Sequence, residues 1–475
     1  MKRVAIIGGG ISGLSAAFHL EKARAAGSDL SYTLIESSKR LGGSMHSARV
    51  DGCLVEAGPD SFLTEKPWAL TLCKELGIDD QVIGSNDGQR KTYIVVKNRL
   101  IAMPDGLMFM VPTKLVPTAL TPLFSWHTKV RMARELMHPP RPMPDDETVG
   151  ELVERHFGAE VVDRLADPLL SGVYGGDANK LSARAVLPRF VEMEEKYGSL
   201  SKAMLAAHNK MKAMAGKQPA RPLFSSLRDG MQQMVDALTA RLNPASLRLN
   251  ARVRGVYPER NRWRVEIDLA GRELFDAVIV ATAANVAGAM LEGVDRDLAD
   301  DLLGVTYSSS VTVTLGYHKD QLKHLPPGFG FLVPRSEGRR MLACTFVHNK
   351  FPYRAPKDKG ILRCFLGGAR DEGVLSFTDA EIVSVVRSEL KEIVKLDVRP
   401  TFQRVYRWRG AMAQYESGHL ARVERIEQRV KNLSTLQLAG NAYHGIGVPD
   451  CIREGTNAAN GVVQALTAAA SVVSR

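Results

Sequence analysis

The sequence predicts an α/β protein whose main unit, a parallel sheet covered by helices, is interrupted by a block of helices and a block of antiparallel strands. Two observations carry this prediction. The apolar run at residues 4–7 leads into three glycines and an alanine-rich helical pattern, and similar strand patterns return at 277–280 and 436–440. Parallel strands that are buried on both faces have such apolar runs, so we assign the three segments to one sheet.

The first turn has the glycine spacing of a dinucleotide-binding site. Gly8 allows the tight turn, Gly10 lets the backbone approach a pyrophosphate, and Gly13 lets the helix pack closely on the strand. Roughly 20 residues later, a second strand pattern at 32–35 ends at Glu36, where a carboxylate that holds the adenosine ribose is expected. The spacing therefore predicts a Rossmann-type domain, and an arginine in place of Glu36 would instead have indicated a ribose phosphate.

The remaining elements follow from local periodicity. In chain order, we expect a helical block at 110–215, a strand at 246–250, a hairpin of 252–256 and 263–267, a strand-rich block at 300–415, and a final helix at 450–468 after the loop 441–449. These patterns divide the chain into a nucleotide-binding domain (1–75, 222–298 and 425–475), a substrate domain (76–109 and 299–424) and a helical domain (110–221).

The composition is that of an ordinary soluble protein with more than one domain. Of 475 residues, 45% are hydrophobic and 24% are charged, which excludes a disordered or fibrous chain. The net charge of +11 is compatible with nucleic acid, an anionic membrane or an acidic substrate, but no nucleic-acid motif supports the first. The five cysteines are scattered, so we expect no metal site and a reducing cytoplasm. Three glycines interrupt the N-terminal apolar run, so we expect no signal peptide there.

One apolar segment, residues 107–126, could contact a membrane. Lys114 and three prolines interrupt it, so it is not expected to span a bilayer, which takes roughly 20 uninterrupted apolar residues. Two interpretations stay open: short helices that line an apolar cavity, which we favour, or a patch that dips into the inner face of the cell membrane. The helical domain is therefore also a candidate for membrane association.

The neighbouring loops identify the dinucleotide. Arg40-Leu41-Gly42-Gly43 follows Glu36, and a Gly-Pro loop at 56–62 follows the next strand pattern. These residues resemble the flavin-containing amine oxidase superfamily, in which the arginine and glycines wrap the pyrophosphate and ribityl chain and the Gly-Pro loop passes over the isoalloxazine ring. The resemblance implies FAD and a glutathione-reductase-like domain. The loop 445–449 precedes a helix whose dipole would stabilise a reduced flavin, although Asn441 stands where relatives usually carry an acid.

The sequence also indicates how the flavin would be reduced. A second glycine motif with the strand and helix context of an NAD(P)H site is absent from the sequence. The substrate itself must then reduce the flavin, and oxygen or another acceptor must reoxidise it. The chain is therefore expected to be an oxidase or a desaturase rather than a reductase.

Three further motifs indicate the substrate. Residues 169–177 with 180–182, residues 328–334 and residues 351–356 resemble the protoporphyrinogen and coproporphyrinogen oxidases, most closely the Gram-positive bacterial form. The resemblance implies oxidation of a porphyrinogen to the porphyrin in haem biosynthesis, with oxygen as acceptor. Coproporphyrinogen III is favoured and protoporphyrinogen IX is the alternative. Membrane contact and oligomeric state stay open.

The same resemblance implies which residues bind the porphyrinogen. The Gly175 carbonyl would accept from the pyrrole N–H groups, and Leu332 and Phe351 would sandwich the ring. Plant and mitochondrial relatives clamp a propionate with an arginine where this chain has Thr92, so we nominate Lys66 as its replacement. Arg90 and Lys91 are second choices. No proton-transfer residue is nominated, because orientation against the flavin is the main requirement.

The flavin-binding residues follow from the glycine motif and the resemblance. They are Gly8, Gly9, Gly10, Ile11, Ser12, Gly13, Ile35, Glu36, Arg40, Gly42, Gly43, Ala57, Gly58, Pro59, Asp60, Val253, Trp408, Gly440, Ile446, Gly447 and Val448. His444 adjoins the last of these loops and is a candidate for tuning the flavin.

Two other classes of protein remain as alternatives. An amine oxidase or carotenoid desaturase would share the nucleotide loops but lack the motifs at 171–182 and 351–356. A prenyl-protein chaperone of this fold would carry no flavin, and the intact glycine loops argue against it.

Overall fold

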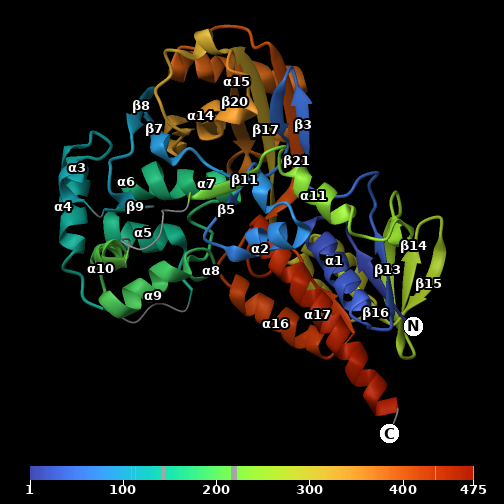
Figure 1. Cartoon of the computed structure of the whole chain (residues 1–475). Helices are drawn as coiled ribbons and strands as arrows, with labels where there is room; N and C mark the ends of the chain where they lie inside the picture. Colours follow the sequence, from blue (N-terminus) through green and yellow to red (C-terminus); the bar gives the residue numbers. More distant parts are fainter. Residues whose placement is uncertain (109, 113, 141–145, 215–221, 434, 474–475) are drawn as a thin grey trace.

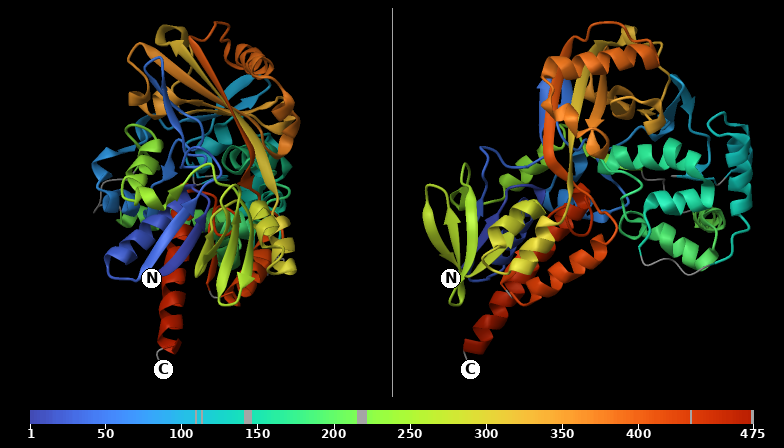
Figure 2. Two further views of the ribbon diagram at one scale, coloured as in Figure 1. Left: turned by 90° about the vertical axis from the view of Figure 1, so that its right-hand side faces the viewer. Right: turned by 180° about the vertical axis from the view of Figure 1, so that it is seen from behind.

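The computed structural model describes the whole chain except residues 109, 113, 141–145, 215–221, 434 and 474–475. Figure 1 shows three parts: a nucleotide-binding part with both termini, a sheet part above it, and a helical part to its left. Figure 2 shows that α17 (Val448–Val473) starts where the parts meet and ends beyond the nucleotide-binding part.

A five-stranded parallel sheet forms the core of the nucleotide-binding part. Its strands, in spatial order, are β12 (Leu247–Arg248), β2 (Leu30–Ile35), β1 (Lys2–Ile7), β16 (Ala277–Val280) and β22 (Leu436–Leu438). The pairs β1–β16 and β16–β22 are parallel, which confirms the prediction that three distant segments share one sheet.

The two faces of this sheet bury alternate residues of β1, because successive side chains point to opposite faces. Val4 and Ile6 pack in the core that also contains α1 (Ile11–Ala25) and α17, whereas Ala5 and Ile7 face the other core. That second core includes the small antiparallel sheet β13 (Val253–Glu259), β14 (Arg262–Ile267) and β15 (Gly271–Phe275). The predicted hairpin is confirmed. The third strand, β15, was not predicted from the sequence, because its exposed half carries charged residues.

The final helix begins earlier than expected. The sequence placed its first residue at Asp450, but α17 starts at Val448. Proline is tolerated in the first turn of a helix, because its missing N–H would have no intrahelical partner there. Pro449 therefore belongs to the helix rather than to the preceding loop.

The sheet part contains a seven-stranded sheet with α15 (Asp379–Val394) packed on one face. Its strands, in spatial order, are β21 (Phe402–Ala413), β17 (Tyr307–His318), β20 (Lys359–Gly367), β19 (Met341–Phe346), β18 (Gly330–Leu332), β7 (Thr92–Val96) and β8 (Arg99–Ala102). The pairs are antiparallel as expected except β18–β7, which is parallel. In that pair, the early hairpin of β7 and β8 joins the edge of a sheet built from later residues.

The described residues of the helical part are mainly helical. The helices are α3 (Leu115–Leu120), α4 (Trp126–Glu135), α5 (Val149–Phe157), α6 (Ala159–Val161), α7 (Asp167–Tyr174), α8 (Ala183–Val186), α9 (Pro188–Tyr197) and α10 (Leu200–Met214). The expected short helices of residues 107–126 are present from Leu115 onward, but before them β9 (Leu107–Met108) pairs with β10 (Val111–Pro112). Within the described part of the chain, no helix is both long and apolar enough to cross a membrane.

The remaining helices and strands lie within these parts or at their junctions. They are β3 (Ser47–Val50), β4 (Cys53–Glu56), β5 (Phe62–Leu63), α2 (Pro67–Leu76), β6 (Val82–Gly84), β11 (Phe224–Leu227), α11 (Gln232–Thr239), α12 (Ala284–Leu291), α13 (Arg296–Leu303), α14 (Val347–Lys350) and α16 (His419–Lys431).

A buried histidine ties the helices of the helical part together. The Nδ1 and Nε2 atoms of His156 lie 2.9 Å from Glu135 Oε1 and 3.2 Å from Glu194 Oε1, and its side chain is 0% exposed. Burial alone would lower the pKa of His156, but hydrogen bonds and charges of the two glutamates outweigh it and raise that pKa. The charged histidine therefore stabilises the fold.

This network makes stability depend on pH. A raised pKa in the folded state contributes stability that is fully present below the unfolded value of 6.5 and is lost as the pH rises through the folded value. Replacing His156 by Gln should therefore lower the free energy of unfolding by about 1 kcal/mol more at about pH 6 than at about pH 9. Urea denaturation at both pH values measures this difference. The exposed His127→Gln is the control, and a destabilisation that grows with pH would contradict the assignment.

Candidate active site

The first glycine turn leaves an open position at the N-terminus of α1. A Cβ on Gly8, whose φ is +107°, would lie 2.6 Å from the Ala281 carbonyl oxygen, and one on Gly13 would lie 1.9 Å from the Gly8 oxygen. At Gly10, by contrast, no described atom lies within 4 Å of the corresponding position. The backbone is therefore crowded on the side of the sheet and open where a pyrophosphate would approach.

The polar groups around this open position suit a nucleotide. Gly10 is the N-cap of α1, and no described side chain caps that helix, so its positive end is available to an anion. Glu36 ends β2, and its carboxylate accepts from the backbone N–H groups of Gly9 and Ser38, at 2.7 Å each. The helix end and the acid thus lie side by side, as binding of a diphosphate and a ribose requires.

A second loop lies against the first turn, and a third loop lies against the second. A Cβ on Gly43 would lie 3.3 Å from Gly10 Cα, and one on Gly58 would lie 2.0 Å from the Ser44 carbonyl oxygen. Arg40 holds the second loop by donating to the carbonyls of Leu41, Gly43 and Met45. The three loops predicted from sequence therefore converge at one edge of the parallel sheet, and the residues present fit a bound dinucleotide.

The third loop is held by the sheet part. The Ala57 carbonyl accepts hydrogen bonds from Thr312 Oγ1 at 3.1 Å, Arg363 Nη2 at 3.3 Å and Trp408 Nε1 at 2.9 Å. These donors come from β17, β20 and β21 respectively. The structure thus places Trp408 beside the predicted Gly-Pro loop, together with two residues that the sequence did not indicate.

Five charged residues, buried or nearly so, lie behind this loop. Lys350 Nζ is 3.1 Å from Asp60 Oδ1, Arg354 Nη1 is 3.0 Å from Glu56 Oε1, and Arg363 Nη1 is 4.0 Å from Asp60 Oδ2. Burial alone would raise the pKa of Asp60, but the charges of Lys350, Arg363 and Arg354 hold it well below its ordinary value. Asp60 is therefore an anion that binds the loop to the sheet part.

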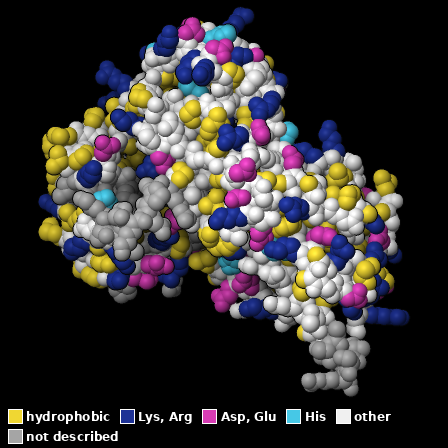
Figure 3. Space-filling view, viewed as in Figure 1, with side chains coloured by type: hydrophobic (Ala, Val, Ile, Leu, Met, Phe, Trp, Pro, Cys, Tyr) yellow, Lys and Arg dark blue, Asp and Glu magenta, His cyan; other side chains and the backbone are white. Residues whose placement is uncertain are grey.

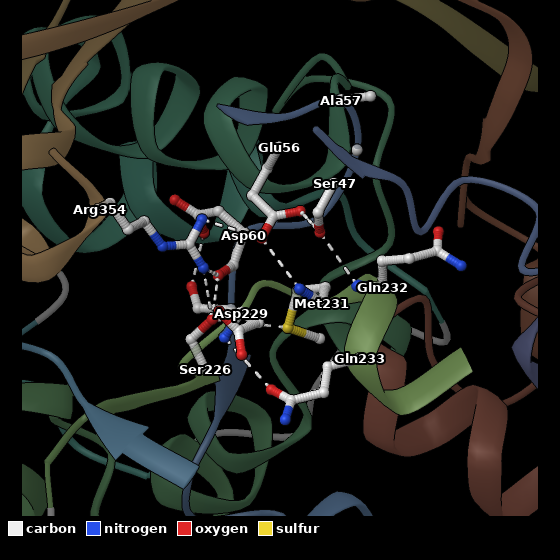
Figure 4. A network of polar contacts seen from close by, with 12 residues as sticks. Ser47, Glu56, Ala57, Asp60, Ser226, Asp229, Met231, Gln232, Gln233 and Arg354 are labelled. Carbon is white, nitrogen blue, oxygen red and sulfur yellow. Dashed lines mark hydrogen bonds and ion pairs between the residues drawn. The ribbon is translucent and has the colours of Figure 1, made fainter. Parts of the chain in front are cut away.

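The same cluster anchors the nucleotide-binding part (Figure 4). Glu56 Oε1 accepts from the Met231 backbone N–H at 2.9 Å, just before α11, and Arg354 Nη2 donates to Ser226 Oγ at 2.6 Å and to the Asp60 carbonyl at 2.9 Å. Residues far apart in the sequence thus meet at one point. The motif at 351–356 contained Arg354, and an arginine among the apolar residues of β20 was the sequence signal for Arg363.

The C-terminal loop completes the site. Tyr415 donates its hydroxyl to the Asn441 carbonyl at 2.9 Å and accepts from the Gly445 N–H at 2.7 Å. Asn441, the departure from the usual acid, donates its side-chain amide to the Ala411 carbonyl at 3.0 Å. His444 lies 2.6 Å from Glu427 of α16, and both side chains are largely exposed.

Lys66 points at the start of α17. Its Nζ lies 2.5 Å from Oδ2 of the buried Asp450, and its side chain is 39% exposed. Asp450 Oδ2 also accepts from the Gly447 N–H at 3.3 Å. Arg90 and Lys91 are exposed, and the Lys91 carbonyl accepts from the Phe329 N–H at 2.8 Å. Of the nominated cations, Lys66 is therefore the one placed beside a carboxylate of the C-terminal loop region.

The predicted substrate residues occupy two places. Gly175 follows α7 with φ +59°, its carbonyl accepts from the Ala369 N–H at 2.8 Å, and α7 packs against β18, which carries Leu332. Phe351 is fully buried, with its ring 5.2 Å from Lys350 Nζ and 4.9 Å from Arg354 Cζ. Gly175 and Leu332 thus lie where the helical part meets the sheet part, whereas Phe351 lies in the charged cluster.

Comparison with known proteins agrees with this geometry. The coproporphyrinogen III oxidase of Bacillus subtilis (strain 168) is 32% identical to the chain, and the alignment covers 96% of each protein. The coproporphyrinogen III oxidase of Staphylococcus aureus (strain NCTC 8325 / PS 47) is also 32% identical, over 98% of this chain and 100% of the relative. A crystal structure from Exiguobacterium sp. 255-15, provisionally described as a protoporphyrinogen oxidase, is 30% identical with a TM-score of 0.86, over 98% of this chain and 99% of that one.

These similarities extend through all three parts of the structure. They confirm the predicted fold class, an FAD-binding Rossmann-type domain with sheet and helical insertions. The protein is a flavoenzyme of the oxidoreductase class. Residues 11–463 match the description "flavin containing amine oxidoreductase", and the chain belongs to that family.

Proposed function

We propose that the protein is an FAD-dependent oxidase that converts a porphyrinogen to the porphyrin in haem biosynthesis, with oxygen as acceptor. The observation that carries this proposal is the junction at Ala57, where a nucleotide-binding loop accepts hydrogen bonds from three strands of the sheet part that carries Leu332. The full-length relatives named coproporphyrinogen III oxidase support the substrate class. Coproporphyrinogen III is the favoured substrate.

The residues proposed to hold FAD are those of the converging loops. The α1 N-terminus and Gly10 would receive the pyrophosphate, Glu36 the ribose, and the backbone at 57–60 the ring. Trp408 is proposed to border the ring through its bond to Ala57. When bound, FAD supplies a hydride acceptor.

The protein's own contribution is orientation of the macrocycle. The Gly175 carbonyl has a second lone pair beside the one that receives the Ala369 N–H, and this lone pair is proposed to accept from pyrrole N–H groups. Leu332 and Phe351 would present apolar surface to the faces of the ring. Phe351 is fully buried here, so binding requires its ring or its neighbours to move.

The substrate proposal is tested by direct comparison of porphyrinogens. Purified protein in air should oxidise coproporphyrinogen III with a kcat/KM about tenfold above that for protoporphyrinogen IX, because one additional charge-assisted hydrogen bond contributes about 1.5 kcal/mol or more. Porphyrin fluorescence measures both rates, and heat-inactivated protein corrects for spontaneous oxidation. A preference for protoporphyrinogen IX would reverse the assignment.

Lys66 is proposed to bind a substrate propionate, although it also pairs with Asp450. Replacing it by Met should raise KM for coproporphyrinogen III about tenfold, through loss of a charge-assisted hydrogen bond, with little change in flavin content. Lys97→Met, in an exposed turn of the sheet part, is the control. An unchanged KM would leave Lys66 only its structural pairing with Asp450.

We further propose that the protein is cytoplasmic and touches the inner face of the membrane through α3 and α4. Val116, Leu120 and Trp126 are 68%, 79% and 74% exposed, and apolar side chains gather at this end of the helical part (left in Figure 3). Lys129 Nζ lies 4.9 Å from the Trp126 ring centroid, so a cation accompanies the apolar surface. Exposed apolar groups beside lysine are typical of interfacial contact.

Vesicle binding tests this contact. The double replacement Leu120→Ser and Trp126→Ser should weaken cosedimentation with phosphatidylglycerol vesicles at least about tenfold, because burial of each large side chain contributes roughly 1.5–3 kcal/mol. Leu269→Ser, an exposed leucine of the nucleotide-binding part, should have no effect. Equal sedimentation of all variants would refute a membrane role for α3 and α4.

A further inference from the structure

We propose that Arg363 is a positioning residue for the flavin: it fixes the backbone at Ala57 and Gly58, and it gives the buried cluster behind them a surplus of positive charge that favours the reduced, anionic flavin. This inference rests on the proposed placement of the flavin ring at residues 57–60. It assigns a function to an arginine that lies outside the motifs of the sequence.

The position of Arg363 in β20 directs its side chain toward the nucleotide-binding part. Its neighbours Leu362 and Cys364 are fully buried in the core of the sheet part, so the alternation of the strand turns Arg363 to the opposite face. There it is 4% exposed, and its Nη2 donates to the carbonyls of Ala57 at 3.3 Å and Gly58 at 2.5 Å. One guanidinium thus binds two consecutive carbonyls of the loop.

The charges of the cluster do not balance. Glu56 and Asp60 supply two negative charges, whereas Lys350, Arg354 and Arg363 supply three positive ones. Arg354 pairs with Glu56 and Lys350 with Asp60, at 3.0 and 3.1 Å, which leaves Arg363 with Asp60 at 4.0 Å as its closest carboxylate in the cluster. Arg363 is therefore the cation that carries the surplus.

A buried surplus charge is unfavourable for folding by itself. Burial lowers the pKa of Arg363 and of Lys350, because the charged forms lose water. Arg363 Nε, in addition, has no hydrogen-bond partner among the described residues. A hydrophobic side chain of similar volume would often be neutral or stabilising at such a position, so a contribution to stability does not account for the arginine.

The surplus charge suits a site where negative charge develops. A preorganised cation in a dry environment stabilises an anion more strongly than it would in water and needs no reorganisation when the charge appears. The N-terminus of α17 acts in the same direction from the C-terminal loop. Two positive potentials, one from the cluster behind the loop at 57–58 and one from a helix end, would thus act on the ring.

The midpoint potential of the bound flavin tests the proposal. Arg363→Met should shift the equilibrium between oxidised and reduced flavin at least about tenfold toward the oxidised form, which is about 30 mV for a two-electron couple. Arg363→Lys keeps the charge but loses the planar fork, so it should keep the potential near that of the wild type while weakening FAD binding. Equilibrium reduction beside a reference dye measures the potential, and flavin release on dilution measures binding.

The controls separate this inference from the proposed function. Arg429→Met removes an arginine of α16 that pairs with Asp295 and Asp297, and it should leave the potential unchanged. If Arg363→Met binds FAD with the wild-type potential, or if Arg363→Lys lowers the potential by about 30 mV or more, the inference is overturned although the oxidase proposal stands. If Arg363→Met does not fold, the midpoint potential of the flavin in Arg363→Lys tests the inference by itself. A wild-type protein that binds no FAD would refute the proposed function itself.

Discussion

The Ala57 carbonyl is the point at which two parts of this protein are joined. It accepts from donors on β17, β20 and β21, while the same short loop packs against Ser44, next to the second glycine loop of the nucleotide-binding part. A buried carbonyl is costly to leave without its donors, because an unmade hydrogen bond would cost the full desolvation of the group. The relative placement of the two parts therefore depends in part on this backbone oxygen.

Buried charge reinforces this junction from behind. Glu56 receives the backbone before α11, Arg354 spans Glu56, Ser226 and the Asp60 carbonyl, and Lys350 neutralises the Asp60 carboxylate. Buried ion pairs are weak contributors to net stability, but breaking one is costly because it leaves an unpaired charge. Such a cluster therefore favours one arrangement of its segments over alternatives.

The helical part uses a different polar network for the same purpose. His156 connects Glu135 of α4 with Glu194 of α9, so three helices meet on one imidazole. At its far side, Leu120 and Trp126 face outward, whereas Leu123 and Phe124, a few residues away, are buried. One short apolar segment thus supplies both the core of the helical part and its exposed apolar surface.

The sequence by itself determined the parallel sheet, the glycine turns and the family motifs, because these depend on local backbone geometry and on the period of apolar residues. It also indicated the loops at 40–43, 57–60 and 445–449. Only the tertiary structure decided what the polar side chains contact: Lys66 pairs with Asp450, His444 with Glu427, and Arg363 with a loop 306 residues away. The partner of a charged side chain cannot be inferred from a single sequence, because its environment comes from segments that only folding brings together.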